Sequence, residues 1–121
     1  MNTFEIKEIV EKLIDTFLDA GKLSLDLRKK GLIKKIKSDN TPVTNGDIKV
    51  NEVLTRKINL LTPNILIISE ETSDNKSIND LKNFWLIDPI DGTHDYVNNL
   101  DEFTINAGLI FDKKPVAGLI Y

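Results

Sequence analysis

Cysteine is absent from this chain of 121 residues, and histidine occurs only once. The lack of cysteine excludes disulfides, thiolate zinc sites and a cysteine nucleophile, and it suits a reducing compartment. No apolar run reaches the ~20 residues that a membrane-spanning helix needs, and charges interrupt the apolar N-terminal stretch, which excludes a signal-peptide core there. We therefore expect a cytoplasmic protein without a transmembrane segment, and we leave peripheral membrane association open.

Positive charge is also scarce, because 16 lysines and arginines are outnumbered by 19 aspartates and glutamates, giving a net charge of −3. Binding to polymeric nucleic acid needs a basic face, so that function is not expected. A small phosphorylated substrate remains compatible, because a bound cation can invert the local charge. We interpret the lysine-rich stretch 29–37 as solvated surface at a helix end rather than as a phosphate site. Its members are Lys29, Lys30, Lys34, Lys35 and Lys37.

A long amphipathic helix is predicted at the start of the chain. Apolar residues recur at steps of three or four from residue 4 to about 28, and the helix should end near Gly31. The apolar face of this helix would comprise Ile6, Ile9, Val10, Leu13, Ile14, Phe17, Leu18 and Gly21.

A second helix is predicted over 45–61 after a loop of composition "SDNTP". Thr44 is the expected N-cap, with Asp47 three residues later as its capping-box partner. Pro63 should stop the helix, because proline removes a backbone donor and clashes with the preceding turn.

Strands are predicted in the second half of the chain, where short apolar runs are bounded by charged or turn residues. The segment 72–83 between the first two strands is expected to be a loop or a short surface helix, and "DKKP" a hairpin turn between the last two. Helices followed by strands predict an α+β fold, a layered sandwich with two N-terminal helices packed on a largely antiparallel sheet. The predicted strands are "NILIISEE" at 64–71, "FWLID" at 84–88, "FTINAGLIFD" at 103–112 and "PVAGLIY" at 115–121.

Carboxylates end two of these strands. Glu70 and Glu71 follow one apolar run, Asp88 ends the next, and Asp91 comes three residues later. If the strands are neighbours, at least three carboxylates converge at one end of the sheet, and like charges so close need a proton or a cation. Oxygen ligands without histidine or cysteine suit Mg²⁺.

The string "DPIDGT" has a mechanical interpretation. Pro89 is expected to turn the chain out of the sheet, so that Asp88, Asp91 and the Ile90 carbonyl can face one ion. Gly92 permits positive φ or close backbone approach, and a short helix starting at Thr93 would offer N–H groups to a phosphate. A surface turn with an Asp cap is the alternative that this string alone leaves open.

Together, "DNTPVTNGD", "SEE" and "WLIDPIDGT" resemble the Mg²⁺-dependent, lithium-sensitive phosphomonoesterases of the inositol monophosphatase and fructose-bisphosphatase superfamily. The match runs over the whole chain but corresponds to the N-terminal portion of such proteins. It implies the N-terminal half of the sugar-phosphatase fold, a cofactor of two or three Mg²⁺ ions, and inhibition by Li⁺.

The resemblance also implies metal ligands. Glu70 would bind the first metal, and Asp88 would bridge two metals. The Ile90 carbonyl would bind the first metal and Asp91 the second. Glu71 would lie near the metals without binding them directly.

The remaining roles concern water and phosphate. Thr93, paired with Asp47, would orient the attacking water, with Glu70 also counted among the catalytic residues. The N–H groups of Gly92 and Thr93 would hold the phosphate, beside Asp91.

Among the subfamilies, "SEE", the "SDNTPVT" loop and the last two strands look most like the 3′(2′),5′-bisphosphate nucleotidases. These convert 3′-phosphoadenosine 5′-phosphate to AMP and phosphate, which clears a by-product of sulfate assimilation. After "DGT" they commonly carry Lys-Glu-Phe, and the inositol phosphatases Thr-Asn-Phe, whereas this chain has His94-Asp95-Tyr96. Inositol-1-monophosphatase and histidinol-phosphatase are therefore kept as alternatives. We interpret His94 as an exposed residue on the short helix.

The family supplies a further Asp from a "WDxAAG"-like motif in its C-terminal half, and this sequence contains no such string. The chain also stops within a predicted strand. We therefore expect residues 1–121 to be the N-terminal metal-binding domain of a longer protein, inactive alone, with the C-terminal domain absent. The resemblance also implies a homodimer for the full-length protein. The alternative of another class is a truncated, non-catalytic fragment or interaction module.

Overall fold

The computed structural model describes residues 1–71 and 80–121, in which two long helices support a four-stranded sheet. The prediction for 72–83 falls mostly outside the described residues. The elements are α1 (Thr3–Lys30), β1 (Lys34–Ile36), β2 (Pro42–Thr44), α2 (Asn45–Leu61), β3 (Leu66–Ser69), β4 (Phe84–Asp91), α3 (Thr93–Val97), β5 (Thr104–Phe111) and β6 (Lys114–Ile120). No helix in the described ranges is long and apolar enough to cross a membrane.

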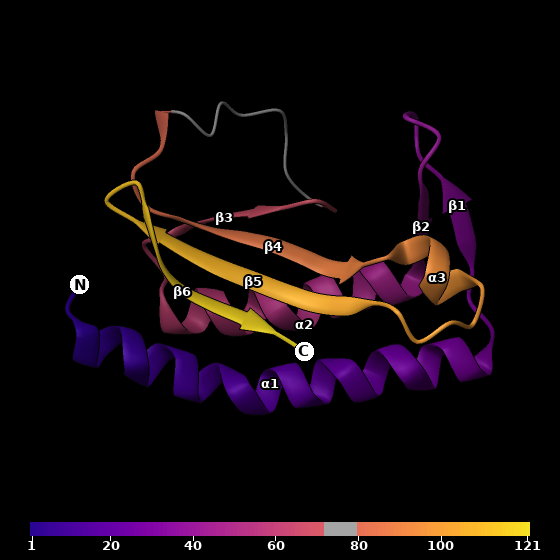
Figure 1. Cartoon of the computed structure of the whole chain (residues 1–121), viewed down its shortest axis with the longest axis horizontal. Coiled ribbons are helices and arrows are strands. Elements are labelled where there is room, and N and C mark those ends of the chain that lie inside the picture. The colour runs from indigo at the N-terminus through magenta and orange to yellow at the C-terminus, as the bar shows by residue number, and fades with distance from the viewer. Residues whose placement is uncertain (72–79) are drawn as a thin grey trace.

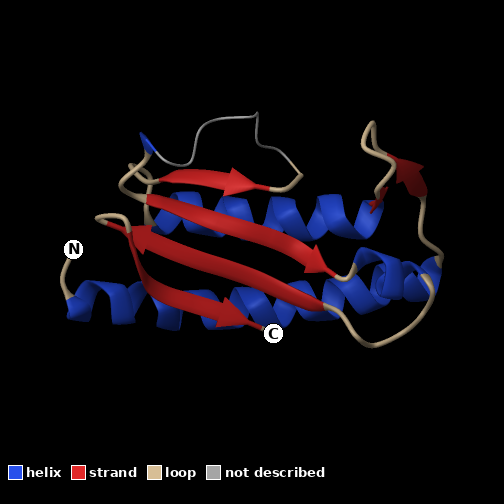
Figure 2. Ribbon diagram, turned by 45° about the horizontal axis from the view of Figure 1, so that its top comes forward, coloured by secondary structure: helices blue, strands red, loops and turns tan. Residues whose placement is uncertain are grey.

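The large sheet has the strand order β3-β4-β5-β6. β3 pairs with β4 in parallel, whereas β4–β5 and β5–β6 are antiparallel. Both long helices lie on the same side of this sheet, as Figures 1 and 2 show. The predicted α+β layering with a largely antiparallel sheet is therefore confirmed.

The first helix begins and ends as its sequence predicts, but it buries a narrower stripe. Asn2 and Glu5 form a capping box at its start, and Gly31 ends it with φ 96°. Its buried residues are Leu13, Phe17, Ala20 and Ser24. The prediction that Ile14 and Leu18 belong to the buried face is wrong, since they are 48% and 47% exposed. Each lies one residue, about 100° around the helix, from the stripe that meets α2 and the sheet. They border a cavity of about 310 Å³ beside β6.

Trp85 anchors the core between the helices and the sheet. It is fully buried, together with Leu54 and Ile58 of α2 and Leu109 of β5. Its indole N–H donates to Thr62 Oγ1 at 3.0 Å, so the only polar atom of the Trp85 side chain has a hydrogen-bond partner although it is buried. The strand that leads to Asp88 is thus fixed to the end of α2.

Strand β4 continues farther than expected. The prediction that Pro89 turns the chain out of the sheet is wrong, because β4 extends to Asp91, with a shift in register against β5 between Asp88 and Asp91. Side chains three residues apart on a regular strand point to opposite faces. An irregularity of this kind changes that alternation, which allows both aspartates to serve one end of the sheet.

A small hairpin, β1–β2, contains the segment predicted to be a loop. Lys34 pairs with Thr44, and Ile36 pairs with Pro42. Asn45 joins this hairpin to α2, because its side chain accepts from Ile33 N at 3.0 Å and its own N–H donates to Ile33 O at 3.1 Å. Each strand of this hairpin has only three residues, and all three residues of β1 are exposed. The hairpin therefore shows no alternation of apolar and polar residues by which the sequence could have predicted it.

Candidate metal and phosphate site

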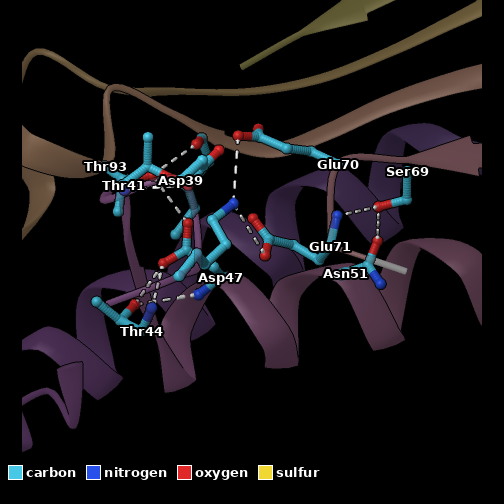
Figure 3. A network of polar contacts seen from close by, with 11 residues as sticks. Asp39, Thr41, Thr44, Asp47, Asn51, Ser69, Glu70, Glu71 and Thr93 are labelled. Atoms are coloured by element: carbon cyan, nitrogen blue, oxygen red, sulfur yellow. Dashed lines mark hydrogen bonds and ion pairs between the residues drawn. The ribbon is translucent and has the colours of Figure 1, made fainter. Parts of the chain in front are cut away.

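Asp47 joins the start of α2 to the "DGT" turn. It is completely buried, and its Oδ2 accepts from Thr44 N at 2.8 Å and from Thr44 Oγ1 at 2.6 Å. Its Oδ1 accepts from Thr93 Oγ1 at 3.0 Å, as Figure 3 shows. The predicted capping box is confirmed, and the same carboxylate contacts a residue 46 positions later. Asp47 can therefore cap the start of α2 with one carboxylate oxygen and pair with Thr93 through the other.

Gly92 creates the turn that brings Thr93 to Asp47. Its φ of 92° and ψ of 40° are left-handed, a conformation that residues with a Cβ rarely adopt. A Cβ here would also lie 2.8 Å from the backbone oxygen of Glu102. The expectation of positive φ and close backbone approach is thus confirmed.

Helix α3 is held in place from beneath by Tyr96. Its hydroxyl donates to Ser24 O at 2.6 Å, and burial raises the pKa of the phenol to about 12. A Cβ on Gly46 of α2 would clash with the Tyr96 hydroxyl and ring. The glycine in "TNGD" therefore lets α3 pack closely against the start of α2.

Arg28 secures the chain that follows α3. Its guanidinium donates to Leu100 O and to Asp101 Oδ1, both at 2.7 Å. It also lies 5.5 Å from the ring centre of Tyr96 and 5.2 Å from that of Phe103. Cation–π contacts of this kind add to the ion pair.

The prediction of an exposed His94 on this short helix is confirmed.

The two strand ends that carry carboxylates are neighbours. The parallel register pairs Ser69 with Ile87, and Glu70 N donates to Ile87 O at 3.2 Å. Glu70 therefore lies beside Asp88. Ser69 Oγ hydrogen-bonds Asn51 Oδ1 at 2.5 Å and accepts from Glu71 N at 3.3 Å, which fixes the turn after β3 to α2.

Asp88 is the most perturbed acid at this end of the sheet. Burial, a side-chain hydrogen bond with Glu70 and the negative charges of Glu70, Asp91 and Glu71 together raise the pKa of Asp88 to about 7. Its Oδ1 is buried and finds no hydrogen-bond partner in the described part of the chain. A buried oxygen among like charges, without a donor, suits a cation as its missing partner. This chemistry fits the oxygen ligation that Mg²⁺ prefers.

Lys37 is the charged residue that the sequence interpretation misplaced. Its ammonium lies 3.6 Å from Glu70 Oε1 and 3.8 Å from Glu71 Oε2, and its side chain is only 25% exposed. The description of Lys37 as solvated surface is wrong, because the β1–β2 hairpin carries it to the acidic strand ends. The position of Lys37 could have been predicted only from the β1–β2 hairpin, and the sequence analysis predicted a loop in that segment.

Glu71 is the more buried of the two glutamates, with 6% of its side chain exposed. Burial raises its pKa, an effect that the charge of Lys37 opposes and those of Asp47 and Glu70 reinforce. The mutual influence of Glu70, Glu71, Asp88 and Asp47 shows that they share one electrostatic neighbourhood. They come from β3, β4 and the first turn of α2.

The predicted ligands do not form a closed cluster. Within residues 1–71 and 80–121, no three carboxylate or imidazole groups are grouped so that they could hold an ion together. The Ile90 carbonyl, an expected ligand, lies 3.2 Å from Thr93 Oγ1 and therefore competes with Asp47 Oδ1 for the single hydroxyl proton of Thr93. The assignment of Glu70, Asp88, Ile90 and Asp91 to individual metals therefore stays a prediction.

Comparison with known proteins gives the class and then the family. In fold, the chain is similar to an inositol monophosphatase (IMPase) of Thermotoga maritima, with a TM-score of 0.80, 23% identity, and coverage of 93% of this chain and 43% of that one. It is also similar to an IMPase/NADP phosphatase whose structure is a complex with Mg²⁺ and phosphate, with a TM-score of 0.74, 23% identity and the same two coverages. The fold is thus the N-terminal portion of the inositol monophosphatase fold.

Sequence comparison assigns the chain to this family directly. Residues 5–121 match the model of the inositol monophosphatase family, so the chain belongs to that family. It is 34% identical over 118 residues to the 3′(2′),5′-bisphosphate nucleotidase CysQ of Aggregatibacter actinomycetemcomitans, which covers 93% of this chain. The chain spans 43% of the length of that relative.

Proposed function

We propose that this chain provides the metal-binding half of a Mg²⁺-dependent phosphate monoester hydrolase, which converts 3′-phosphoadenosine 5′-phosphate to AMP and phosphate. Two observations carry this proposal: the hydrogen bond between buried Asp47 and partly buried Thr93, and Asp88 Oδ1, which is buried without a donor among the described residues. The likeness to a bisphosphate nucleotidase supports the substrate. The description of residues 1–121 as an N-terminal metal-binding domain, and the homodimer, belong to the same proposal.

Four groups would hold the metal ions. Glu70 follows β3 and lies beside Asp88, which is within β4. Asp91 ends β4, and Ile90 lies between the two aspartates in the chain. When bound, Mg²⁺ would offset the charge of the phosphate and make water a better nucleophile. We propose two or three such ions, with Li⁺ as an inhibitor.

The chain's own residues would orient the water and the phosphate. Asp47 Oδ1 is the nearer of the two acceptors of the Thr93 hydroxyl, and a hydroxyl that donates to Asp47 has lone pairs free to accept a hydrogen bond from water. Asp47 cannot rotate away, since Thr44 holds its second oxygen. The backbone at Gly92 and Thr93 would contact the phosphate, because glycine permits close approach there.

The substrate is tested by measuring phosphate release from 3′-phosphoadenosine 5′-phosphate, inositol 1-phosphate and histidinol phosphate, with Mg²⁺ and with EDTA. We expect release that EDTA abolishes and that is fastest from the nucleotide. Preference for inositol 1-phosphate would favour the second candidate, which the family model supports. Mg²⁺-dependent nucleotide binding without turnover would instead identify a non-catalytic module. The chain by itself and the whole protein are assayed separately, since the activity is proposed for the latter.

Thr93→Val should lower kcat by about 100-fold while leaving KM nearly unchanged, because it removes the hydroxyl that would orient the water and keeps the shape of the side chain. The lost hydrogen bond should cost only about 1 kcal/mol of stability. Steady-state kinetics and urea unfolding of the whole protein check both numbers. Thr93→Ser, the matched control, keeps the hydroxyl and should retain most activity. An unchanged kcat in Thr93→Val would rule out the proposed role of Thr93.

A further inference from the structure

Lys37 supplies a positive charge from within the chain to the place where the strand-end carboxylates gather. Its ammonium is shared between Glu70 Oε1 at 3.6 Å and Glu71 Oε2 at 3.8 Å. The two glutamates follow β3, whereas Lys37 follows β1 more than thirty residues earlier in the chain. An ion pair between exposed side chains contributes little. Here, however, Glu71 is almost fully buried and Lys37 three-quarters buried, so the Lys37–Glu71 pair is shielded from solvent, whereas the Glu70 side chain is half exposed.

The backbone that carries Lys37 is fixed, whereas its side chain has a long flexible stem. Lys37 N donates to Thr41 O at 2.8 Å, and its carbonyl accepts from Asn40 N at 2.9 Å. Asp39 closes the turn by accepting from Thr41 N at 3.1 Å and from Thr41 Oγ1 at 2.5 Å. These hydrogen bonds lower the pKa of Asp39 and keep it charged. Any movement of the ammonium is therefore confined to the side chain.

We propose that Lys37 is a tethered counter-ion of the strand-end carboxylates, which competes with a divalent cation for Glu70. The inference rests on the metal site of the proposed function. An ammonium and Mg²⁺ cannot both be close to Glu70 without strong repulsion, because the Coulomb energy of like charges rises steeply at short distance. The divalent ion must therefore displace the lysine side chain. Lys37 thus sets two properties: the stability of the metal-free chain, which it raises, and the affinity for Mg²⁺, which it lowers.

The test compares Lys37→Met, which keeps most of the stem and removes the charge, with Lys37→Arg, which keeps the charge. Mg²⁺ is titrated into each protein by calorimetry at one pH and salt concentration, and thermal unfolding is recorded in EDTA. We expect Lys37→Met to bind Mg²⁺ about fivefold more tightly than wild type and to unfold at a lower temperature without metal. Lys37→Arg should stay close to wild type in both measurements. Lys35→Met, an exposed position on the same hairpin, controls for loss of one positive charge.

The outcomes separate this inference from the proposed function. If wild type binds Mg²⁺ and Lys37→Met binds it equally or more weakly, Lys37 is not a competitor and only the inference fails. Unchanged thermal unfolding of metal-free Lys37→Met would also overturn the counter-ion role. If no protein in the series binds Mg²⁺, both the inference and the metal site are wrong. An effect of Lys35→Met as large as that of Lys37→Met would reduce the result to net charge and overturn the inference too.

Discussion

Asp88→Asn is expected to abolish Mg²⁺ binding and, at the same time, to stabilise the metal-free chain. The affinity should fall because Asp88 is the carboxylate that lies beside Glu70 across the parallel strand pair and precedes Asp91 on the same strand. The stability should rise because asparagine removes a partly buried negative charge from among three others and can donate to a neighbouring carboxylate. Opposite changes in binding and stability are typical of a residue kept for function.

The size of the stability change depends on pH in a defined direction. The folded pKa of Asp88 is raised from an ordinary carboxyl value to about 7. Above pH 7 the charged Asp88 carboxylate therefore destabilises the folded chain. This destabilisation disappears as the pH falls to about 4, because Asp88 becomes protonated in the folded chain. After allowance for solvent screening, we expect Asp88→Asn to gain roughly 1–2 kcal/mol at pH 8 and almost nothing at pH 4.

Urea unfolding in EDTA at the two pH values measures the gain, and calorimetry measures the loss of Mg²⁺ binding. Asp15→Asn, at an exposed position on α1, is the matched control and should change neither. Mg²⁺ binding by Asp88→Asn at wild-type affinity would remove Asp88 from the metal site. A metal-free variant less stable than wild type at pH 8 would show that its buried oxygen has a partner in the folded chain.

Local patterns predicted the elements that position the site. The capping box of Thr44 and Asp47 was readable because its two residues are three positions apart, and the same buried aspartate reaches Thr93. The end of β3 was also readable, since an apolar run followed by acids marks where a buried strand leaves the core, whereas β4 continues past Asp88 to Asp91. The prediction that the acidic residues of β3 and β4 converge required these two strands to be neighbours. The parallel pairing of β3 with β4 shows that they are.

The features that could not be predicted depend on contacts between distant segments. Lys37 resembles any surface lysine until the hairpin carries it to Glu70 and Glu71. The continuation of β4 through Pro89 depends on pairing with β5, because a proline in a strand is tolerated where the ladder is irregular. Ile14 and Leu18 have the right period for burial, yet the width of the contact with α2 and the sheet, which no period reveals, leaves them half-exposed.

Gly92→Ala is expected to be the most destabilising single-atom change near the site. Two costs add at this position: a left-handed φ of 92° and a Cβ placed 2.8 Å from the Glu102 carbonyl oxygen. The first costs about 1 kcal/mol and the second ~1–3 kcal/mol, because a backbone atom cannot yield as a side chain can. A loss of about 3 kcal/mol is a large share of the stability of a small domain, so the melting temperature should fall by roughly 12 °C.

Two other glycines separate these costs. Gly31 has a φ of 96° with no atom within 4 Å of an added Cβ, and Gly118 has neither the left-handed φ nor a close atom. Gly31→Ala should therefore lose only the ~1 kcal/mol of backbone strain, and Gly118→Ala should lose almost nothing. Calorimetric unfolding of the three variants measures the series. Equal losses in Gly92→Ala and Gly31→Ala would mean that the chain after α3 yields to the new Cβ. In that case the close approach of Glu102 would not be what holds Thr93 against Asp47.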